Sequence, residues 1–391
     1  MVSIARKNLF QDLPRFIVAQ AGIMFAVGLV TIQVGLLNGF TRSSTLLIEN
    51  AEADIWIASK ELQHLDLTLP LKYKILTQAK AVQGVERAEA LIAQSTVWRY
   101  QTEQIAPIRI IGFDPKSQLF HPHPILEGNL EQINQPYSIF IDSLDLKQLD
   151  VQGVGNQSEI GSFKGKVVGL TKGIRSIVSS PYVFTSLPNA VAYLNSPIAS
   201  PQKNPPVPAP LTENNLITFV LVKARPGEDI QGLKARLAKA LPDTRILTQS
   251  ELTELTQKHW QQSTGVGYIL GLGAVVGIIV GTVVVGQILY SSVTDHLKEF
   301  GTMKAMGSSD WFIYRIILEQ ALWMAILGYL PGMGLCLSLG AWTMNVQAIQ
   351  ILIKPLTAAG VFLVTVTMCS GAAVFAIQKV TRLDAALVFK S

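Results

Sequence analysis

The stretch FIVAQAGIMFAVGLVTIQVGLLNGFT, residues 16–41, decides the fold, because it places 26 uncharged residues between Arg15 and Arg42. A helix of roughly 20 apolar residues crosses the ~30 Å hydrocarbon core of a bilayer. The run is too long for the apolar core of a secretory signal, and the small residues around Ala51 lie too far beyond it for a cleavage site. We therefore expect an uncleaved transmembrane helix over 16–41.

Three more apolar stretches follow after a gap of more than two hundred residues. They predict spans over 265–293, 320–344 and 355–378. The predicted fold class is an α-helical transmembrane bundle of four spans, with a large mixed α/β domain over 42–264 inserted between spans one and two. The remaining segments are a terminal segment over 1–15, a loop over 294–315, a short loop over 345–354 and a tail over 379–391.

The composition fits a membrane protein and argues against a nucleic-acid partner. The chain is 49% hydrophobic and only 15% charged, whereas about a quarter of an ordinary soluble protein is charged. Between residues 43 and 264, 21 basic residues balance 21 acidic ones, so the net charge of +5 lies in the segments that flank the spans. A nucleic-acid-binding protein would instead cluster its basic residues on one face.

The flanking charges also predict the orientation, because Lys and Arg mark the cytoplasmic side of short loops. They lie before span one, between spans two and three, and after span four: Arg6, Lys7, Arg15, Lys298, Lys304, Arg315, Lys379, Arg382 and Lys390. The connection between spans three and four has only Lys354. We expect both termini and the 294–315 loop in the cytoplasm, and the 42–264 domain on the other side.

The predicted spans have no charged residue in their interiors, which argues against an ion-coupled transporter. Gly273, Gly277 and Gly281 lie four residues apart on one face of span two, where another helix can approach closely. This face either packs within the subunit or serves a helix that slides or dimerises. Cys336 and Cys369 both lie in apolar stretches and provide no disulfide framework or metal motif.

The external domain is predicted to mix strands and helices. Alternating or β-rich runs predict strands over 54–58, 85–100, 105–113, 137–141, 166–170, 182–184, 216–222 and 245–247, with a hairpin around 101–104. Helices are expected over 229–241 and 250–258, and six prolines in 195–210 predict an extended linker. We expect two lobes, a membrane-proximal one from about 43–115 and 211–258 and a distal one inserted over about 116–210.

No segment of this domain has a catalytic motif. His121-Pro-His123-Pro lacks a nearby acidic or Cys partner for a metal and favours a turn. Gly161–Lys166 has three residues between its glycines and no Lys-Ser/Thr, so it departs from the phosphate-binding loop. We expect no metal, no bound cofactor and no enzymatic activity of this chain by itself.

The segment Asp295–Gly307 carries the most specific local pattern. As a helix it places Val293, Leu297 and Phe300 on one face, and Gly301 and Gly307 permit a turn before span three. Periodicity alone also fits a short helix that lies on the bilayer surface.

The run EFGTMKAMG over 299–307 resembles the E-I-G-x-L-K/R-A-L/I-G signature of the FtsX-like/MacB-type permeases of ABC transporters, with conservative departures at Phe300, Met303 and Met306. That family has the same layout of one span, an external domain and three spans. Within it the chain is most similar to the cyanobacterial DevC (heterocyst glycolipid exporter) group. The strings that carry this similarity are Ser3–Asn8, Ile57–Leu71, Val85–Tyr100, Ile111–Pro115 and Ile141–Asp145.

The resemblance implies a homodimeric permease in the bacterial inner membrane that works with a separate cytoplasmic ABC ATPase, which binds the ATP and Mg. The ATPase-coupling element would consist of Leu297, Lys298, Glu299, Phe300, Gly301, Met303, Lys304, Ala305, Met306 and Gly307. Closure of the ATPase would move the periplasmic domain (mechanotransmission), which would act on a membrane-fusion adaptor and a TolC-like outer-membrane channel. The DevC-like strings imply export of a glycolipid or other lipid. The alternatives are a lipoprotein-releasing permease and a non-transporting signalling permease of the same superfamily.

Overall fold

The structure is a computed structural model that describes residues 13–100, 104–175, 179–197, 205–262, 265–347 and 351–381. It divides into two compact units, a helical one formed by Met1–Gly39 with Gly265–Ser391 and an external one formed by Phe40–Thr264. Most of the segments predicted over 1–15 and 379–391, and the tip of the hairpin at 101–103, lie outside the described residues.

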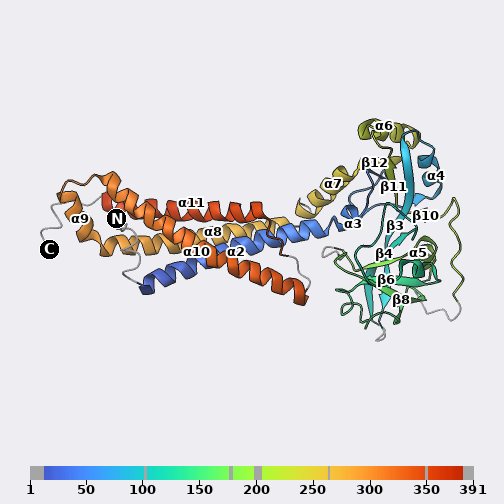
Figure 1. Cartoon of the computed structure of the whole chain (residues 1–391), viewed down its shortest axis with the longest axis horizontal. Helices are drawn as coiled ribbons and strands as arrows, with labels where there is room; N and C mark the ends of the chain where they lie inside the picture. The colour runs from blue at the N-terminus through green and yellow to red at the C-terminus, as the bar shows by residue number, and fades with distance from the viewer. Residues whose placement is uncertain are drawn as a thin grey trace. The chain divides into compact units, whose positions relative to one another are not determined.

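The helical unit contains four helices that are long and apolar enough to cross a membrane, within the described ranges. These are α2 (Leu13–Ser43), α8 (Val266–Asp295), α10 (Asp310–Gln347) and α11 (Pro355–Thr381). The short helix α9 (Leu297–Ala305) lies between the ends of α8 and α10 (Figure 1). Helix α10 begins ten residues before the predicted span at 320, because Arg315 and Glu319 interrupt the apolar run but not the helix.

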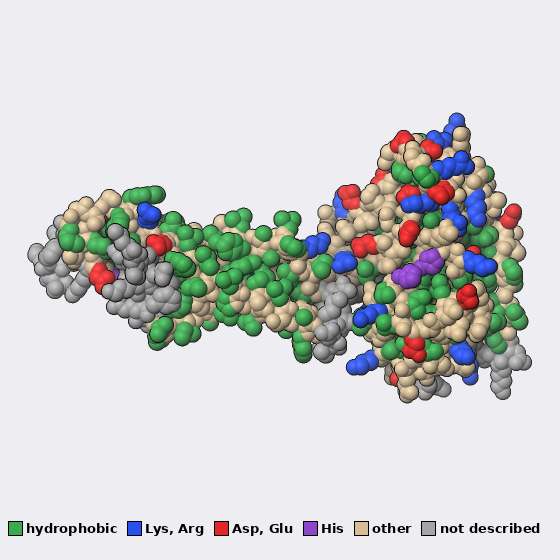
Figure 2. Space-filling view, in the orientation of Figure 1, with side chains coloured by type: hydrophobic (Ala, Val, Ile, Leu, Met, Phe, Trp, Pro, Cys, Tyr) green, Lys and Arg blue, Asp and Glu red, His purple; other side chains and the backbone are tan. Residues whose placement is uncertain are grey.

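One core holds the helical unit together. Its buried side chains come from α2, α8, α9, α10 and α11, among them Ile23, Val285, Phe300, Ile317 and Ala372. On the face seen in Figure 2, hydrophobic side chains cover much of the coloured surface of this unit. A bundle that is apolar inside and outside is the pattern expected of helices surrounded by lipid.

The external unit is built on a ten-stranded sheet with the order β12-β1-β11-β3-β4-β9-β6-β8-β5, to which β7 adds by pairing with β3 and β8. Its strands are β1 (Ile55–Ser59), β3 (Val85–Arg99), β4 (Ile105–Phe113), β5 (Ile125–Gly128), β6 (Ser138–Asp142), β7 (Gln157–Ile160), β8 (Phe163–Thr171), β9 (Tyr182–Ser186), β11 (Phe219–Ala224) and β12 (Thr244–Thr248). A separate two-stranded sheet pairs β2 (Leu71–Lys72) with β10 (Leu216–Ile217).

The long strand β3 joins the two halves of the sheet. Its first half pairs antiparallel with β11, and its second half pairs antiparallel with β4. The contacts β4–β9 and β6–β8 are parallel. The sheet is therefore mixed. It joins β1, β11 and β12, which come from the two ends of the external unit in sequence, to β6, β8 and β9, which come from its middle.

Each face of the sheet has its own core, because successive side chains of a strand point to opposite faces. In β1, Ile55 and Ile57 belong to one core, and Trp56 and Ala58 belong to the other. The first core is covered by α4 (Lys74–Lys80), α5 (Leu187–Leu194) and α6 (Ile230–Ala240). The second receives side chains from α3 (Leu46–Glu49), the 3-10 helix η1 (Leu130–Asn134) and α7 (Gln249–Gln262).

The strand and helix predictions for the external unit are confirmed with shifts of a few residues at the ends, except that the single strand predicted over 216–222 is divided into β10 and β11, which belong to different sheets. The helices α4 and α5 and the short strands β2, β5 and β7 were not predicted. Residues 205–210 of the predicted linker are described and form no helix or strand, whereas 198–204 lie outside the described residues. The two-lobe boundaries stay a prediction, although β4, assigned to the proximal lobe, pairs with β9 of the middle segment.

Candidate functional site

The predicted coupling segment follows α8 after a one-residue break in the helix at His296. This residue ends α8 and begins α9, with its own N–H bonded to the Ser292 carbonyl at 3.2 Å. The Phe300 N–H in turn donates to the His296 carbonyl at 3.0 Å. Hydrogen bonding is thus maintained across the junction, so that α9 is held in a defined direction with respect to α8.

A glycine ends α9. Gly307 has a φ of +90°, a conformation that residues with a Cβ adopt only at a cost. Its N–H donates to the Lys304 carbonyl at 3.0 Å, and the Ser308 N–H donates to the Met303 carbonyl at 3.0 Å. This pair of bonds is the Schellman motif of helix C-termini, and it turns the chain toward α10. The last glycine of the 299–307 motif therefore has a backbone role.

Pairs of charged or titratable side chains connect the helix ends around α9. The Lys304 Nζ lies 3.0 Å from the Asp310 Oδ1, which connects α9 to the start of α10. The Glu299 Oε2 lies 3.2 Å from the His296 Nδ1, a pair that is ionic only when the histidine is protonated. Asp295 at the end of α8 pairs with Arg15 near the start of α2.

The motif divides into buried and exposed residues. Phe300 is buried in the core of the bundle with Val293, and Met303 packs against the same core. Met306 and Trp311 are 74% and 76% exposed, and Glu299, Gly307 and Phe312 are also exposed. We call the set Glu299, Met306, Gly307, Trp311 and Phe312 the turn surface. The side chains of Leu297, Lys298 and Ala305, which were also predicted to couple, lie outside what the structure describes.

The three predicted glycines of span two face α2 of the same chain. A Cβ built on Gly273 would lie 2.6 Å from the Gln33 Nε2, and one on Gly277 would lie 2.8 Å from the Leu29 Cδ2. A Cβ on Gly281 would lie 2.5 Å from the Ala26 Cβ and 2.6 Å from the Met368 Sδ. Of the two alternatives, the geometry supports packing within the subunit. Dimerisation through this face would require α2 to move away.

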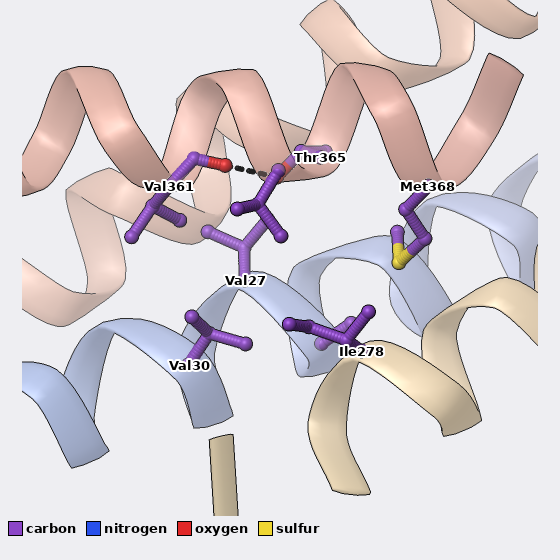
Figure 3. Close-up of a pocket in the computed structure, with 8 residues that line it drawn as sticks. Val27, Val30, Ile278, Val361, Thr365 and Met368 are labelled. Atoms are coloured by element: carbon purple, nitrogen blue, oxygen red, sulfur yellow. Dashed lines mark hydrogen bonds between the residues drawn. The ribbon is translucent and has the colours of Figure 1, made fainter. Parts of the chain in front are cut away.

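The bundle contains a small apolar cavity of about 10 Å³. Figure 3 shows its lining from α2, α8 and α11, including Val30, Ile278 and Met368. The hydroxyl of Thr365 donates its proton to the Val361 carbonyl at 2.8 Å, so it has no second proton to donate into the cavity. A cavity of this size holds at most about one water molecule, so it is a packing gap and not a path for cargo.

The external unit contains a buried pair of carboxyl groups on the motif at 141–145. Asp142 accepts hydrogen bonds from the Ile174 N–H at 2.9 Å and the Leu144 N–H at 3.0 Å. Asp145 is buried and lies 2.8 Å from the Arg175 Nε. Burial raises the pKa of Asp145 to about 7, because the loss of water and the neighbouring Asp142 outweigh the attraction of Arg175.

A second cluster, which sequence reasoning missed, joins the 60–70 turn to α7. The rings of His64 and His259 stack with centroids 3.9 Å apart, and Trp260 meets His64 edge-on at 5.8 Å. Burial, and next the charge of His259, lower the pKa of His64. The sequence signal that could have found the cluster is the aromatic pair His259-Trp260 just before span two.

The remaining motifs have structural roles. Gly161 has a φ of +60° in the tight turn between β7 and β8, where Ile160 pairs with Phe163. The glycine thus serves a strand-to-strand turn, which agrees with the departure of 161–166 from the phosphate-loop pattern. The rings of His121 and His123 lie 5.8 Å apart, and no group of three or more metal-binding side chains occurs among the residues that were placed.

Comparison with known proteins assigns the chain to a family. The profile of the MacB-like periplasmic core domain matches residues 16–240, and that of the FtsX-like permease C-terminal domain matches residues 271–385. The chain is 23% identical over 287 residues to the macrolide export ATP-binding/permease protein MacB of Psychrobacter arcticus, covering 71% of this chain and 37% of that protein. It is 26% identical over 122 residues to an uncharacterized ABC transporter permease of Methanocaldococcus jannaschii, covering 29% of this chain and 30% of that one. The chain thus spans well under half the length of these relatives.

Among solved structures, the periplasmic region of MacB from Actinobacillus actinomycetemcomitans aligns with a TM-score of 0.35 at 11% identity, covering 52% of this chain and 92% of that one. The extracellular domain of the noncanonic ABC-type transporter YknZ from Gram-positive bacteria aligns with a TM-score of 0.33 at 13% identity, covering 50% of this chain and 98% of that one. The family assignment rests on the profiles, one of which covers more than half of the sequence. The chain belongs to the FtsX-like permeases of ABC transporters that carry a MacB-like periplasmic core domain between their first and second spans.

Proposed function

We propose that this chain is the transmembrane permease subunit of an ABC exporter in a bacterial inner membrane, acting as a homodimer with a separate cytoplasmic ATPase. ATP and Mg would be bound by that partner. Membership of the permease family supports the proposal. The orientation follows the basic flanks of the spans, with both termini and the 294–315 segment in the cytoplasm.

The observation that carries the proposal is the turn surface. Met306 and Trp311 project from the join between α9 and α10, where large exposed apolar side chains suit a protein partner. Phe300 anchors α9 in the bundle core, and the Lys304–Asp310 pair connects α9 to α10. A force applied to the turn surface would therefore be passed to α8 and α10, and the other end of α8 is joined along the chain to the external unit. This is the physical basis of mechanotransmission in the proposal.

In this proposal the cargo does not cross the membrane through a polar channel between the spans. Among the described residues the bundle has the 10 Å³ apolar gap and no charged side chain in the predicted span interiors. The DevC-like strings favour a glycolipid or another lipid as cargo, handed to a membrane-fusion adaptor and a TolC-like channel. Purification with partners separates the candidates: an adaptor and channel indicate export, whereas a cell-wall hydrolase or a histidine kinase indicates signalling.

The test replaces exposed apolar side chains of the turn surface. The double variant Met306→Ser/Trp311→Ala, reconstituted in nanodiscs with its ATPase, should lose the stimulation of ATP hydrolysis and bind the ATPase more weakly. The matched control is Val207→Ser, which removes an 81% exposed valine from the external unit. Equal stimulation of the double variant, the control and the unsubstituted chain would remove the turn surface from the coupling mechanism.

Reversal of charge is a less direct test of the same element. Exchanging Glu299 and Lys304 would also break their pairs with His296 and Asp310 inside the chain. A loss of stimulation could then arise from a distorted turn. The apolar variants leave both ion pairs intact.

A further inference from the structure

A turn in the external unit holds two leucines out of its core. The turn lies between β1 and β2, over residues 60–70, and Leu67 and Leu69 are 57% and 56% exposed. The residues from Leu67 to Pro70 carry no charge. Adjacent exposed apolar side chains of this kind mark a surface that contacts another apolar phase or molecule.

The exposure of the leucines is imposed by a rigid framework. The buried guanidinium of Arg109 donates to the Leu65 carbonyl at 3.1 Å and the Asp66 carbonyl at 3.2 Å. The Leu67 N–H donates to the His64 carbonyl at 3.0 Å. These bonds hold the backbone from Leu65 to Leu67 in a defined turn, from which the Leu67 side chain is exposed.

Within the external unit, the turn is linked by ring contacts to Phe40, which lies near the end of α2. His64 stacks on His259, and Trp260 lies edge-on to both His64 and Phe40, with ring centroids 5.8 Å apart in each case. Phe40 lies on α2 and is the next-to-last residue of the uncharged run 16–41. Trp is enriched at the boundary between hydrocarbon and water. The Phe40–Trp260 contact therefore indicates the interface, and His64 ties the turn to it.

We propose that residues 64–70 form a lipid-contact element that places Leu67 and Leu69 in the interfacial layer of the membrane spanned by this chain. Its partner is the bilayer surface itself. The Leu65 N–H also donates to the Thr256 hydroxyl of α7 at 3.2 Å. Since α7 leads into α8, lipid contact at the turn would restrain the helix that connects the external unit to the second span. The element is independent of which cargo is exported.

The test measures lipid contact directly in the full chain. Leu69→Cys and the control Leu126→Cys are each labelled with an environment-sensitive fluorophore in nanodiscs that contain lipid with a doxyl quencher near the headgroup. Leu126 is a matched control because it is 53% exposed and lies on β5, at the opposite end of the strand order from β12 and β1. The native Cys336 and Cys369 are buried, and the labelled unsubstituted chain serves as the blank.

We expect loss of fluorescence at position 69 and none at position 126. Fluorescence at position 69 that is insensitive to the quencher would overturn the proposal. A fluorophore at position 69 that is shielded from water only when two copies of the chain are cross-linked would also overturn the proposal. The surface would then contact a second chain and not lipid. Size-exclusion profiles and thermal unfolding that match the unsubstituted chain establish that both labelled variants are folded.

Discussion

Gly307 shows how a single backbone conformation defines the end of the coupling helix. Its φ is +90°, and the N–H groups of Gly307 and Ser308 bond to carbonyls of the last turn of α9. Glycine adopts this positive φ without the steric clash that a Cβ would cause. Gly307→Ala should loosen the end of α9 at a cost of about 1–2 kcal/mol, and ATPase stimulation should fall. Hydrogen exchange of the 303–308 amides in the full chain measures the change.

A conservative variant distinguishes backbone strain from lost contact at this position. Asn tolerates the left-handed region better than Ala, and a Cβ at Gly307 would meet no atom within 4 Å. Gly307→Asn should therefore recover much of the protection that Gly307→Ala loses. If Asn is as disruptive as Ala, the strain argument for the motif's last glycine is wrong.

Asp145 gives a prediction of pH dependence. Its pKa in the folded chain, about 7, lies above the ordinary value of 3.8. The folded state thus holds the proton that the unfolded state has released, so this group's contribution to stability is fully present below about pH 4 and is lost as pH rises toward 7. The loss should be on the order of 4 kcal/mol.

The measurement is thermal unfolding of the full chain between pH 4 and 8, followed by tryptophan fluorescence. Asp145→Asn cannot ionise and should flatten the decline over this range. An Asp145→Asn curve that runs parallel to that of the unsubstituted chain would show that another group causes the decline.

Sequence patterns located the 299–307 segment but did not show how each of its residues is placed. The 299–307 signature located the segment, and the periodicity placed Phe300 on an apolar face, where the structure buries it. The exposure of Met306 and Trp311 depends on the angle of the turn set by Gly307 and the Lys304–Asp310 pair. The cluster of His64 with His259 joins residues nearly two hundred positions apart, which a local pattern cannot reveal.

At the scale of elements, the approach of α8 to α2 depends on absent side chains. A methyl group on Gly281 would meet the Cβ of Ala26 at 2.5 Å, and that atom cannot move without its backbone. Gly281→Ala should therefore destabilise the bundle by about 1–3 kcal/mol through overpacking. Thermal unfolding in detergent measures the effect.

The same helix provides the control. Gly271 has no atom within 4 Å of its expected Cβ position, so Gly271→Ala should leave the unfolding temperature unchanged or raise it slightly. Equal destabilisation by the two substitutions would point to a general effect on α8 and not to the contact with α2.

The elements that could be predicted are those with a strong local period. The strands β3, β4 and β11 and the helix α6 have long apolar or amphipathic patterns, and all were expected. Helix α5 was missed because it has only eight residues, too few to establish a helical period. Its signals were the Ser186 cap, which accepts from the Asn189 N–H, and Pro188 in the first turn.

At the scale of the whole molecule, the spacing of the spans determines where coupling and cargo handling can occur. One span before the external unit and three after it leave a single sizeable loop, between α8 and α10, on the side of the N-terminus. If the basic residues are cytoplasmic, the turn surface lies on the side of the proposed ATPase and the external unit lies in the opposite compartment. The pairing order of that sheet could not be predicted, because it depends on contacts between distant strands such as β1 and β12.

Labelling from opposite sides of the membrane tests this arrangement. Val207→Cys and Met306→Cys replace side chains of similarly high exposure, one in the external unit and one on the turn surface. A membrane-impermeant maleimide should label position 207 in intact spheroplasts and position 306 only after the membrane is permeabilised. The unsubstituted chain, whose two cysteines are buried, provides the background. Labelling of both positions from the same side would place the external unit and the turn surface in one compartment, and no force generated at an ATPase could then cross the bilayer through these helices.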